Sequence, residues 1–233
     1  VGDSVTFNIT NMPSWATFNA TTGVLSGIPE NNDVGTHNAI TITITDSYDE
    51  VATLNAFDIT VINTNDSPII TGTPNTTVNE DSLYSFIAVG SDIDLGDTLT
   101  YSVTNKPSWA TLNATTGELS GTPENNNVGD FNDIVISLSD GTELISLPTF
   151  NISVINTNDA PIISGTPNSS VIDNTEYSFT PVGSDVDTGD TFTFNISGLP
   201  SWASFSTENG RVLGTPTLSD VGTYDDIVIS IIS

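Results

Sequence analysis

Residues 134–138 read I-V-I-S-L, and the matching stretches I-T-I-T-I and I-V-I-S-I occupy residues 40–44 and 227–231. In each stretch a large aliphatic residue stands at the first, third and fifth positions. This period of two, with many β-branched residues, predicts a β-strand that buries one face. The sequence shows no amphipathic helix of useful length, so we expect an all-β protein.

The same alternation recurs elsewhere in the chain, at residues 5–9, 99–103 and 150–154. Turn motifs separate these stretches, for example N-A-T-T-G from Asn19 and again from Asn113. Many short strands separated by turns predict an antiparallel sandwich of two sheets.

A long repeat organises the whole sequence. The motif P-S-W-A begins at Pro13, Pro107 and Pro200, and I-N-T-N-D begins at Ile62 and Ile155. These positions give a period of about 93 residues, which suits one small β-sandwich with about seven strands. The chain is therefore expected to be a tandem array.

Alignment of the repeats predicts three units. Residues 67–159 form a complete unit 2. Residues 1–66 form a partial unit 1 that lacks the opening strands, and residues 160–233 form a partial unit 3 that lacks the closing strand. The chain is thus expected to be an excerpt from a longer array.

The charge of the chain and its lack of cysteine limit the partners and the kinds of site that it can have. It has 29 acidic and 2 basic residues among 233, a formal net charge of −27, and no cysteine. Because both partners require a basic face, this charge argues strongly against nucleic acid as a partner and disfavours binding to anionic membranes. Disulfides and cysteine-based zinc sites are excluded as well. No run of about 18 apolar residues is present, and a signal peptide is not expected in the sequence. The composition fits an exported protein in a salty or calcium-rich medium.

An acidic loop occurs twice in the sequence. Residues 89–98 read V-G-S-D-I-D-L-G-D-T, and residues 182–191 read V-G-S-D-V-D-T-G-D-T. Each loop places three aspartates within six residues, with no lysine or arginine nearby. Two interpretations remain open. The aspartates either bind a cation, or they shape ordinary turns, in which aspartate is common.

The order of motifs in unit 2 resembles a known family. It runs from V-N-E-D at Val78 through the D-x-D loop at Asp92 and P-S-W-A at Pro107 to V-I-N-T-N-D-A-P from Val154. This order is similar to that of cadherin-like repeats of the dystroglycan type, which are often labelled immunoglobulin-like domains in bacterial surface proteins. The resemblance implies Greek-key β-sandwiches of the cadherin or immunoglobulin type, with Ca²⁺ held between consecutive units.

The resemblance also implies which residues would bind this Ca²⁺. At the first junction they are Asn63, Asn65 and Asp66 of the linker, with Asp92, Asp94 and Asp140 of unit 2. At the second junction they are Glu80 of unit 2, Asn156, Asn158 and Asp159 of the linker, and Asp185 and Asp187 of unit 3. Asparagine stands at two linker positions where cadherins usually have aspartate, so sites of low affinity are expected.

No residue pattern points to catalysis. The single histidine, His37, aligns with Phe131 and Tyr224 and is expected to pack as an aromatic side chain. No set of serine, histidine and acid recurs, and a carboxylate pair for glycoside hydrolysis would need a cleft. The recurring tryptophans, of which Trp109 is one, are expected in the core rather than on a sugar-binding surface.

These observations predict a non-enzymatic, extracellular, calcium-stiffened stalk or spacer of an adhesin or surface fibre. Its partners would be neighbouring repeats of the array and, in a fibre, other subunits. The alternative is a module of a secreted multidomain protein that binds a glycan or a protein. A groove with aromatic residues on one unit, absent from the others, would favour this alternative.

Overall fold

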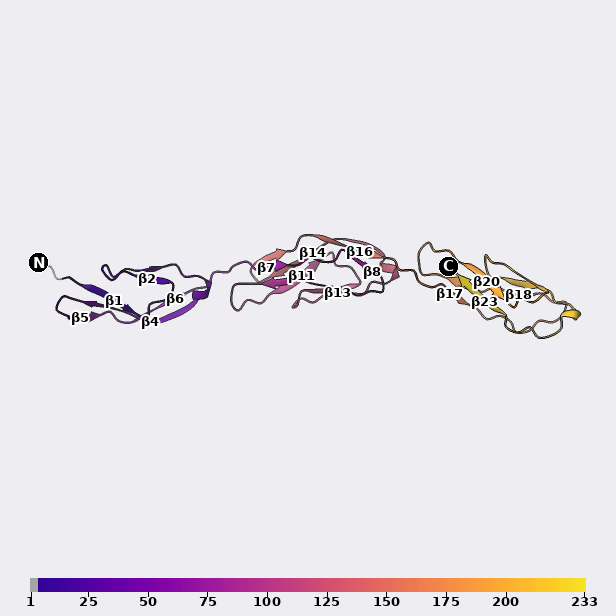
Figure 1. The fold of residues 1–233 in the computed structure, drawn as a ribbon, viewed down its shortest axis with the longest axis horizontal. Helices are drawn as coiled ribbons and strands as arrows, with labels where there is room; N and C mark the ends of the chain where they lie inside the picture. The colour runs from indigo at the N-terminus through magenta and orange to yellow at the C-terminus, as the bar shows by residue number, and fades with distance from the viewer. Residues whose placement is uncertain (1–3) are drawn as a thin grey trace.

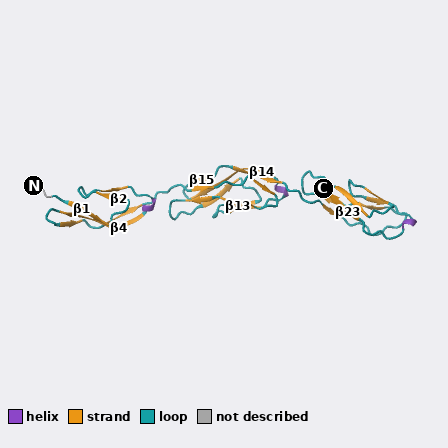
Figure 2. Cartoon of the chain, in the orientation of Figure 1, coloured by secondary structure: helices purple, strands orange, loops and turns teal. Residues whose placement is uncertain are grey.

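A computed structural model describes residues 4–233 and shows three units arranged end to end (Figure 1). All regular elements are β-strands apart from three single-turn 3-10 helices, which lie at the same end of each unit (Figure 2). The predicted all-β class is therefore confirmed. None of the helices in residues 4–233 has the length and apolar character needed to cross a membrane.

Unit 2 has ten strand segments that form seven strands. They are β7 (Ile69–Thr71), β8 (Thr77–Asn79), β9 (Tyr84–Ile87), β10 (Val89–Ser91), β11 (Thr100–Thr104), β12 (Ala110–Leu112), β13 (Glu118–Gly121), β14 (Gly129–Ser139), β15 (Leu144–Ser146) and β16 (Phe150–Ile155), with the 3-10 helix η2 (Asn125–Asn127). Short breaks divide three strands into the pairs β7/β8, β9/β10 and β15/β16. Joined across these breaks, the segments give the seven strands expected.

Two sheets face each other in unit 2. One contains β11, β14, β16 and β8 in that order, with β15 also on β14. The other contains β12, β13 and β9, and β7 pairs with β10. Neighbouring strands are antiparallel except β8, which lies parallel to β16. The first strand thus begins in one sheet as β7 and ends in the other as β8.

The core of unit 2 lies between these sheets. Ile134, Ile136 and Leu138 of β14 are fully buried, which confirms the alternation read from the sequence. Tyr101, Phe86, Phe150 and Ile152 join the same cluster, as predicted. Trp109 is half-buried at the rim of this cluster. Its ring packs edge-on between Tyr84 and Phe131, with centroids 5.8 and 5.9 Å away.

Unit 1 contains the counterparts of β11 to β16. Its elements are β1 (Thr6–Thr10), β2 (Ala16–Phe18), β3 (Leu25–Gly27), η1 (Asn31–Asp33), β4 (Gly35–Thr45), β5 (Val51–Thr53) and β6 (Phe57–Val61). Strand β4 pairs with β1, β5 and β6.

Unit 3 contains the counterparts of β7 and of β9 to β13, with a shorter counterpart of β14. Its elements are β17 (Ile162–Ser164), β18 (Tyr177–Phe179), β19 (Val182–Ser184), β20 (Thr193–Ser197), β21 (Ala203–Phe205), β22 (Val212–Gly214), η3 (Leu218–Asp220) and β23 (Val228–Ile232). Within residues 4–233, unit 3 shows no counterpart of β8, β15 or β16. The boundaries of the units, at residues 66 and 159, stay a prediction.

A β-bulge divides the long strand of units 1 and 2. In β14 the register with β16 shifts between Phe131 and Ile134, and Asp133 has a positive φ of 59°. The backbone N–H of Asp133 donates to Asn151 Oδ1 of β16 at 3.0 Å. In unit 1 the N–H of Ala39 donates in the same way to Asp58 Oδ1 of β6 at 2.8 Å. The second residue of the closing strand therefore holds the bulge.

Burial of Tyr84 predicts how unit 2 responds to alkali. Burial raises the pKa of Tyr84 to about 12 from 10.0. A raised folded-state pKa contributes stability that is present below pH 10 and is lost as the pH rises towards 12. The loss of unfolding free energy that the raised pKa of Tyr84 causes at high pH is below ~2.7 kcal/mol, the value for two pKa units. Tyr84→Phe should remove this loss. Denaturant titrations between pH 9 and pH 12, with Tyr48→Phe as the exposed control, would measure it. Equal alkaline slopes for Tyr84→Phe and the parent would contradict the prediction.

Candidate cation sites at the junctions

Three segments meet at the junction between units 2 and 3. Glu80 follows β8, the linker residue Asp159 follows β16, and Asp187 lies in the acidic loop after β19. One carboxylate oxygen from each of these residues lies within 4.8 Å of the others. Two units and their linker therefore contribute to one cluster.

Glu80 is the most deeply buried charged residue of this cluster. Its side chain is 1% exposed. Oε1 accepts a hydrogen bond from the N–H of Thr157 in the linker at 2.5 Å, whereas Oε2 is buried and has no hydrogen-bond partner. A buried polar atom without a partner is rare because its desolvation is not compensated.

Hydrogen bonds fix the other two carboxylates. The N–H of Asp159 donates to Asp187 Oδ2 at 2.6 Å. Asn125 Nδ2, from η2, donates to Asp159 Oδ2 at 2.9 Å and to Asp187 Oδ1 at 3.3 Å. The amide of Asn125, which belongs to unit 2, thus contacts both the linker and unit 3.

No basic side chain neutralises the cluster within residues 4–233. Lys106 donates to the carbonyl oxygens of Pro107 and Ala110, and Arg211 donates to Ser178. Two carboxylates at about 4 Å repel each other by roughly 4 kcal/mol at the effective dielectric constant of a protein surface. The arrangement is therefore costly unless a cation is bound.

A second cluster lies on unit 2 at its junction with unit 1. It contains Asp92, Asp97 and Asp140, again with one oxygen each within 4.8 Å of the others. Partial desolvation, and after it the charges of Asp92, Asp94 and Asp140, raise the pKa of Asp97. Hydrogen bonds from Glu143 N–H, Asn65 and Thr142 N–H lower the pKa of Asp140. Asp140 is therefore held ionised, whereas Asp97 is repelled by its neighbours.

At the first junction, Asp66 and Asn31 make the same contacts as Asp159 and Asn125 make at the second. The N–H of Asp66 donates to Asp94 Oδ2 at 2.6 Å. Asn31 Nδ2, from η1, donates to Asp66 Oδ2 at 2.6 Å and to Asp94 Oδ1 at 3.3 Å. Asn65 Nδ2 donates to Asp140 Oδ2 at 3.0 Å. These contacts join the acidic loop of unit 2 to unit 1.

In each acidic loop, only one carboxylate oxygen of the first aspartate accepts the hydrogen bond that shapes the turn. Asp92 Oδ1 accepts from the N–H of Asp94 at 2.9 Å, and Asp185 Oδ1 accepts from the N–H of Asp187 at 3.1 Å. Such a bond across two residues is typical of an aspartate that shapes a turn. The Oδ2 atoms of Asp92 and Asp185 are nevertheless buried without a partner. The turn interpretation therefore accounts for half of each carboxylate.

Some residues named by the resemblance lie outside these contacts. Asn63 and Asn156 are exposed, and no hydrogen bond of either side chain is found within residues 4–233. Asn158 Nδ2 donates to the carbonyl oxygen of its neighbour Asp159 at 2.9 Å. The role of these three residues as cation ligands stays a prediction.

The structure adds three residues that the sequence did not single out as ligands. Asn31 and Asn125 each donate hydrogen bonds to the linker aspartate and to the acidic-loop aspartate of their junction. Asp97 joins the cluster on unit 2. The recurring P-E-N-N motif at residues 29–32 and 123–126 was the available signal. The charged residue of this motif, its glutamate, caps the 3-10 helix. The asparagine that follows the glutamate contacts the junction.

Comparisons with known proteins agree with the repeat. A family model described as Putative Ig domain matches residues 1–62, 67–155 and 160–230. No curated protein matches the chain. Among solved structures, the chain is similar to the three N-terminal domains of the Highly Immunogenic Outer Capsid protein (Hoc) of bacteriophage RB49. The identity is 14%, the match covers 98% of this chain and 81% of that chain, and the TM-score is 0.29.

Proposed function

Since the chain belongs to the Putative Ig domain family, whose model matches it three times in tandem, we propose that it is a calcium-stiffened spacer of an extracellular adhesin or surface fibre. The observation that carries this proposal is the buried carboxylate of Glu80, which clusters with those of Asp159 and Asp187 and whose Oε2 has no hydrogen-bond partner. Besides calcium, the partners of the chain would be further repeats of the array and other subunits of the fibre.

The ligand chemistry favours calcium. The candidate ligands are all oxygens of carboxylates, amides and backbone, and Ca²⁺ binds six to eight such oxygens. At the second junction Glu80, Asp159 and Asp187 would supply carboxylates, with Asp185 at the edge of the site. Asn125 would supply its Oδ1 after its amide turns over, a rotation that leaves the side chain in place. Mg²⁺ would fit less well because it requires a strict octahedral shell.

The position of the clusters suggests a mechanical role. Glu80 belongs to unit 2, Asp187 to unit 3 and Asp159 to the linker, so one ion at this cluster would cross-link two units. Without an ion, repulsion between the carboxylates would favour bending at the linker. The end-to-end arrangement in Figure 1 is the one that bound ions would maintain. The non-enzymatic nature of the chain is part of the same proposal.

The Glu80→Gln variant tests the proposal because its effect should change sign with calcium. In saturating calcium the variant should bind one ion fewer or more weakly and should melt at a lower temperature than the parent. In chelator it should be more stable than the parent by about 1 kcal/mol, since an unpartnered buried charge has been removed. Isothermal titration calorimetry and thermal melting would measure both effects.

Glu176→Gln is the matched control, since Glu176 is exposed and lies away from the junctions. This control should behave like the parent in both conditions. A Glu80→Gln variant with the parent's calcium stoichiometry and affinity would contradict a calcium site at the second junction.

A further inference from the structure

One sheet of unit 2, which contains β7, β9, β10, β12 and β13, has an apolar outer face. Along β9 the side chains alternate, so that Tyr84 and Phe86 are buried in the core whereas Ile87 is 54% exposed. Ile69 of β7 and Val89 of β10 are both 60% exposed and lie on the same side of this strand pair. Three large aliphatic side chains of one sheet therefore face the solvent.

The strands of this sheet carry almost no charge. The chain has 29 acidic residues, but only one of them, Glu118 at the start of β13, lies in these five strands. Glu118 is directly opposite Ile87 in the sheet, and its Oε1 accepts a hydrogen bond from Ser85 Oγ at 3.1 Å. Few charges and several exposed aliphatic side chains are typical of the centre of a protein–protein interface.

The equivalent face of unit 3 is apolar at the same positions. Ile162 of β17 and Val182 of β19 are 61% and 65% exposed and lie on the same side of their strand pair. They are equivalent to Ile69 and Val89, and the strands of their sheet contain no charged residue. Since unit 2, with all seven strands, exposes these positions to the same extent, the exposure belongs to the outer surface of the units.

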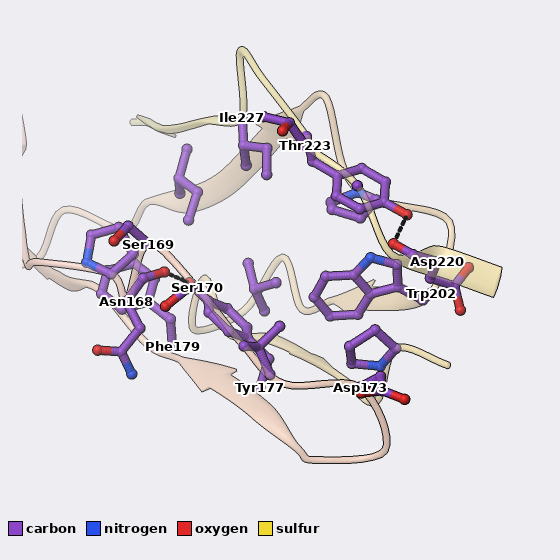
Figure 3. A pocket seen from close by; sticks show the side chains of 18 of the residues that line it. Asn168, Ser169, Ser170, Asp173, Tyr177, Phe179, Trp202, Asp220, Thr223 and Ile227 are labelled. Carbon is purple, nitrogen blue, oxygen red and sulfur yellow. Dashed lines mark hydrogen bonds between the residues drawn. The ribbon is translucent and has the colours of Figure 1, made fainter. Parts of the chain in front are cut away.

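A basic residue takes the place of the acid on the face of unit 3. In Figure 3, Tyr177 and Phe179 of β18 point into the space between the two sheets, so Ser178 between them faces outward. Arg211 immediately precedes β22 and is equivalent to Glu118. Its Nε donates to Ser178 Oγ at 3.3 Å, and Ser178 is equivalent to the serine that contacts Glu118. The two faces therefore carry opposite charges at the same point.

We propose that two copies of this chain pack side by side and antiparallel, with the outer face of unit 2 of each copy on that of unit 3 of the other. Within one chain the units follow one another end to end (Figure 1), so its own two faces cannot meet. A two-fold axis between the copies joins both pairs of faces at once and places Glu118 of each copy beside Arg211 of the other.

Charge complementarity selects this pairing over the others. Unit 2 on unit 2 would bring Glu118 against itself, and unit 3 on unit 3 would do the same for Arg211, so both would place like charges together. Arg211 is one of only two basic residues in a chain with a net charge of −27. Its position on an apolar face that matches the face around Glu118 is therefore the feature that identifies a second copy as the partner.

This proposal specifies the subunit contact of the surface fibre, and in that respect it rests on the proposed function. None of the residues in the two faces is a candidate cation ligand. Pairing can therefore fail where calcium binding is confirmed, and the reverse. When all association measurements use one calcium concentration, differences between variants report on the faces alone.

Sedimentation equilibrium of the whole chain tests the pairing. In ~0.15 M salt, where charges more than about 8 Å apart are largely screened, the parent should show a reversible equilibrium between monomer and dimer. Glu118→Arg and Arg211→Glu should each weaken dimerisation at least ~10-fold, because each dimer would then contain two like-charge contacts. An equimolar mixture of these two variants should dimerise like the parent, since every contact is again between opposite charges.

Two control variants separate the faces from the rest of the surface. Lys106→Glu changes the net charge as Arg211→Glu does, but Lys106 lies between β11 and β12, outside both faces, so it should dimerise like the parent. Ile87→Asn should weaken dimerisation because it removes an apolar side chain beside Glu118. Leu144→Asn should not, since Leu144 is equally exposed but lies in β15 of the other sheet.

Three results would overturn the proposal. They are a parent chain that stays monomeric, a mixture of the charge variants that associates no better than either variant alone, and equal weakening by Arg211→Glu and Lys106→Glu. All variants should keep the parent's circular dichroism, because every substituted side chain lies outside the core.

Discussion

The Trp109→Ala variant is expected to lose about 3–5 kcal/mol of unfolding free energy in unit 2, the range for deleting a large core aromatic. Trp109 packs edge-on against Tyr84 and Phe131, so its removal opens a void between the two sheets. Because Trp109 is half-buried, a value near the lower end is expected. Urea unfolding followed by circular dichroism would measure the loss.

Trp109→Phe is the matched control for this variant. The indole Nε1 of Trp109 is buried without a hydrogen-bond partner, so phenylalanine gives up no hydrogen bond and keeps part of the packing. Its loss should stay below ~1.5 kcal/mol, as for other substitutions that retain most of the packing. A loss below about 1 kcal/mol for Trp109→Ala would place Trp109 on the surface and would revive a sugar-binding role.

Removal of calcium is expected to have the second large effect. Affinities near 10⁻⁴ to 10⁻³ M are typical of extracellular modules. At a calcium concentration 100 times the dissociation constant, each site would add about 2.7 kcal/mol. Chelation should therefore lower the melting temperature, and small-angle scattering should show a broader distribution of shapes as the junctions bend.

Asp92→Asn combined with Asp94→Asn should reproduce this loss at the first junction only. Both residues belong to the acidic loop there, and Asp94 is bonded to the linker through Asp66. The control, Asp130→Asn with Glu208→Gln, removes two charges from exposed positions outside both acidic clusters and should leave calcium binding unchanged. Melting and scattering curves that do not respond to chelator would leave the acidic loops as solvated turns.

Much of the fold could be predicted because strand periodicity is a local property. The alternation at 134–138 identified the buried face of β14, since residues two apart lie on the same side of a strand. The strand breaks were not predictable. The first strand divides into β7 and β8 because it changes sheets, and that change depends on the partners β10 and β16.

The candidate sites could be predicted in part for a similar reason. The acidic loops are visible because their aspartates are close in sequence. The asparagine contacts are not visible in this way, since Asn125 is 62 residues from Asp187 and a neutral side chain carries no signal of its own. Asp97 was not among the predicted ligands, and only the fold places it beside Asp140.

The sequence by itself determined the repeat, the strand pattern, the excess of acid and the family, because all of these depend on residue order and composition. The tertiary structure alone decided which charges meet. Glu80 and Thr157 are 77 residues apart yet hydrogen-bonded, and Asn125 donates to Asp187 across 62 residues. The reason is physical: burial and charge repulsion depend on distances in space, and packing between remote segments sets those distances.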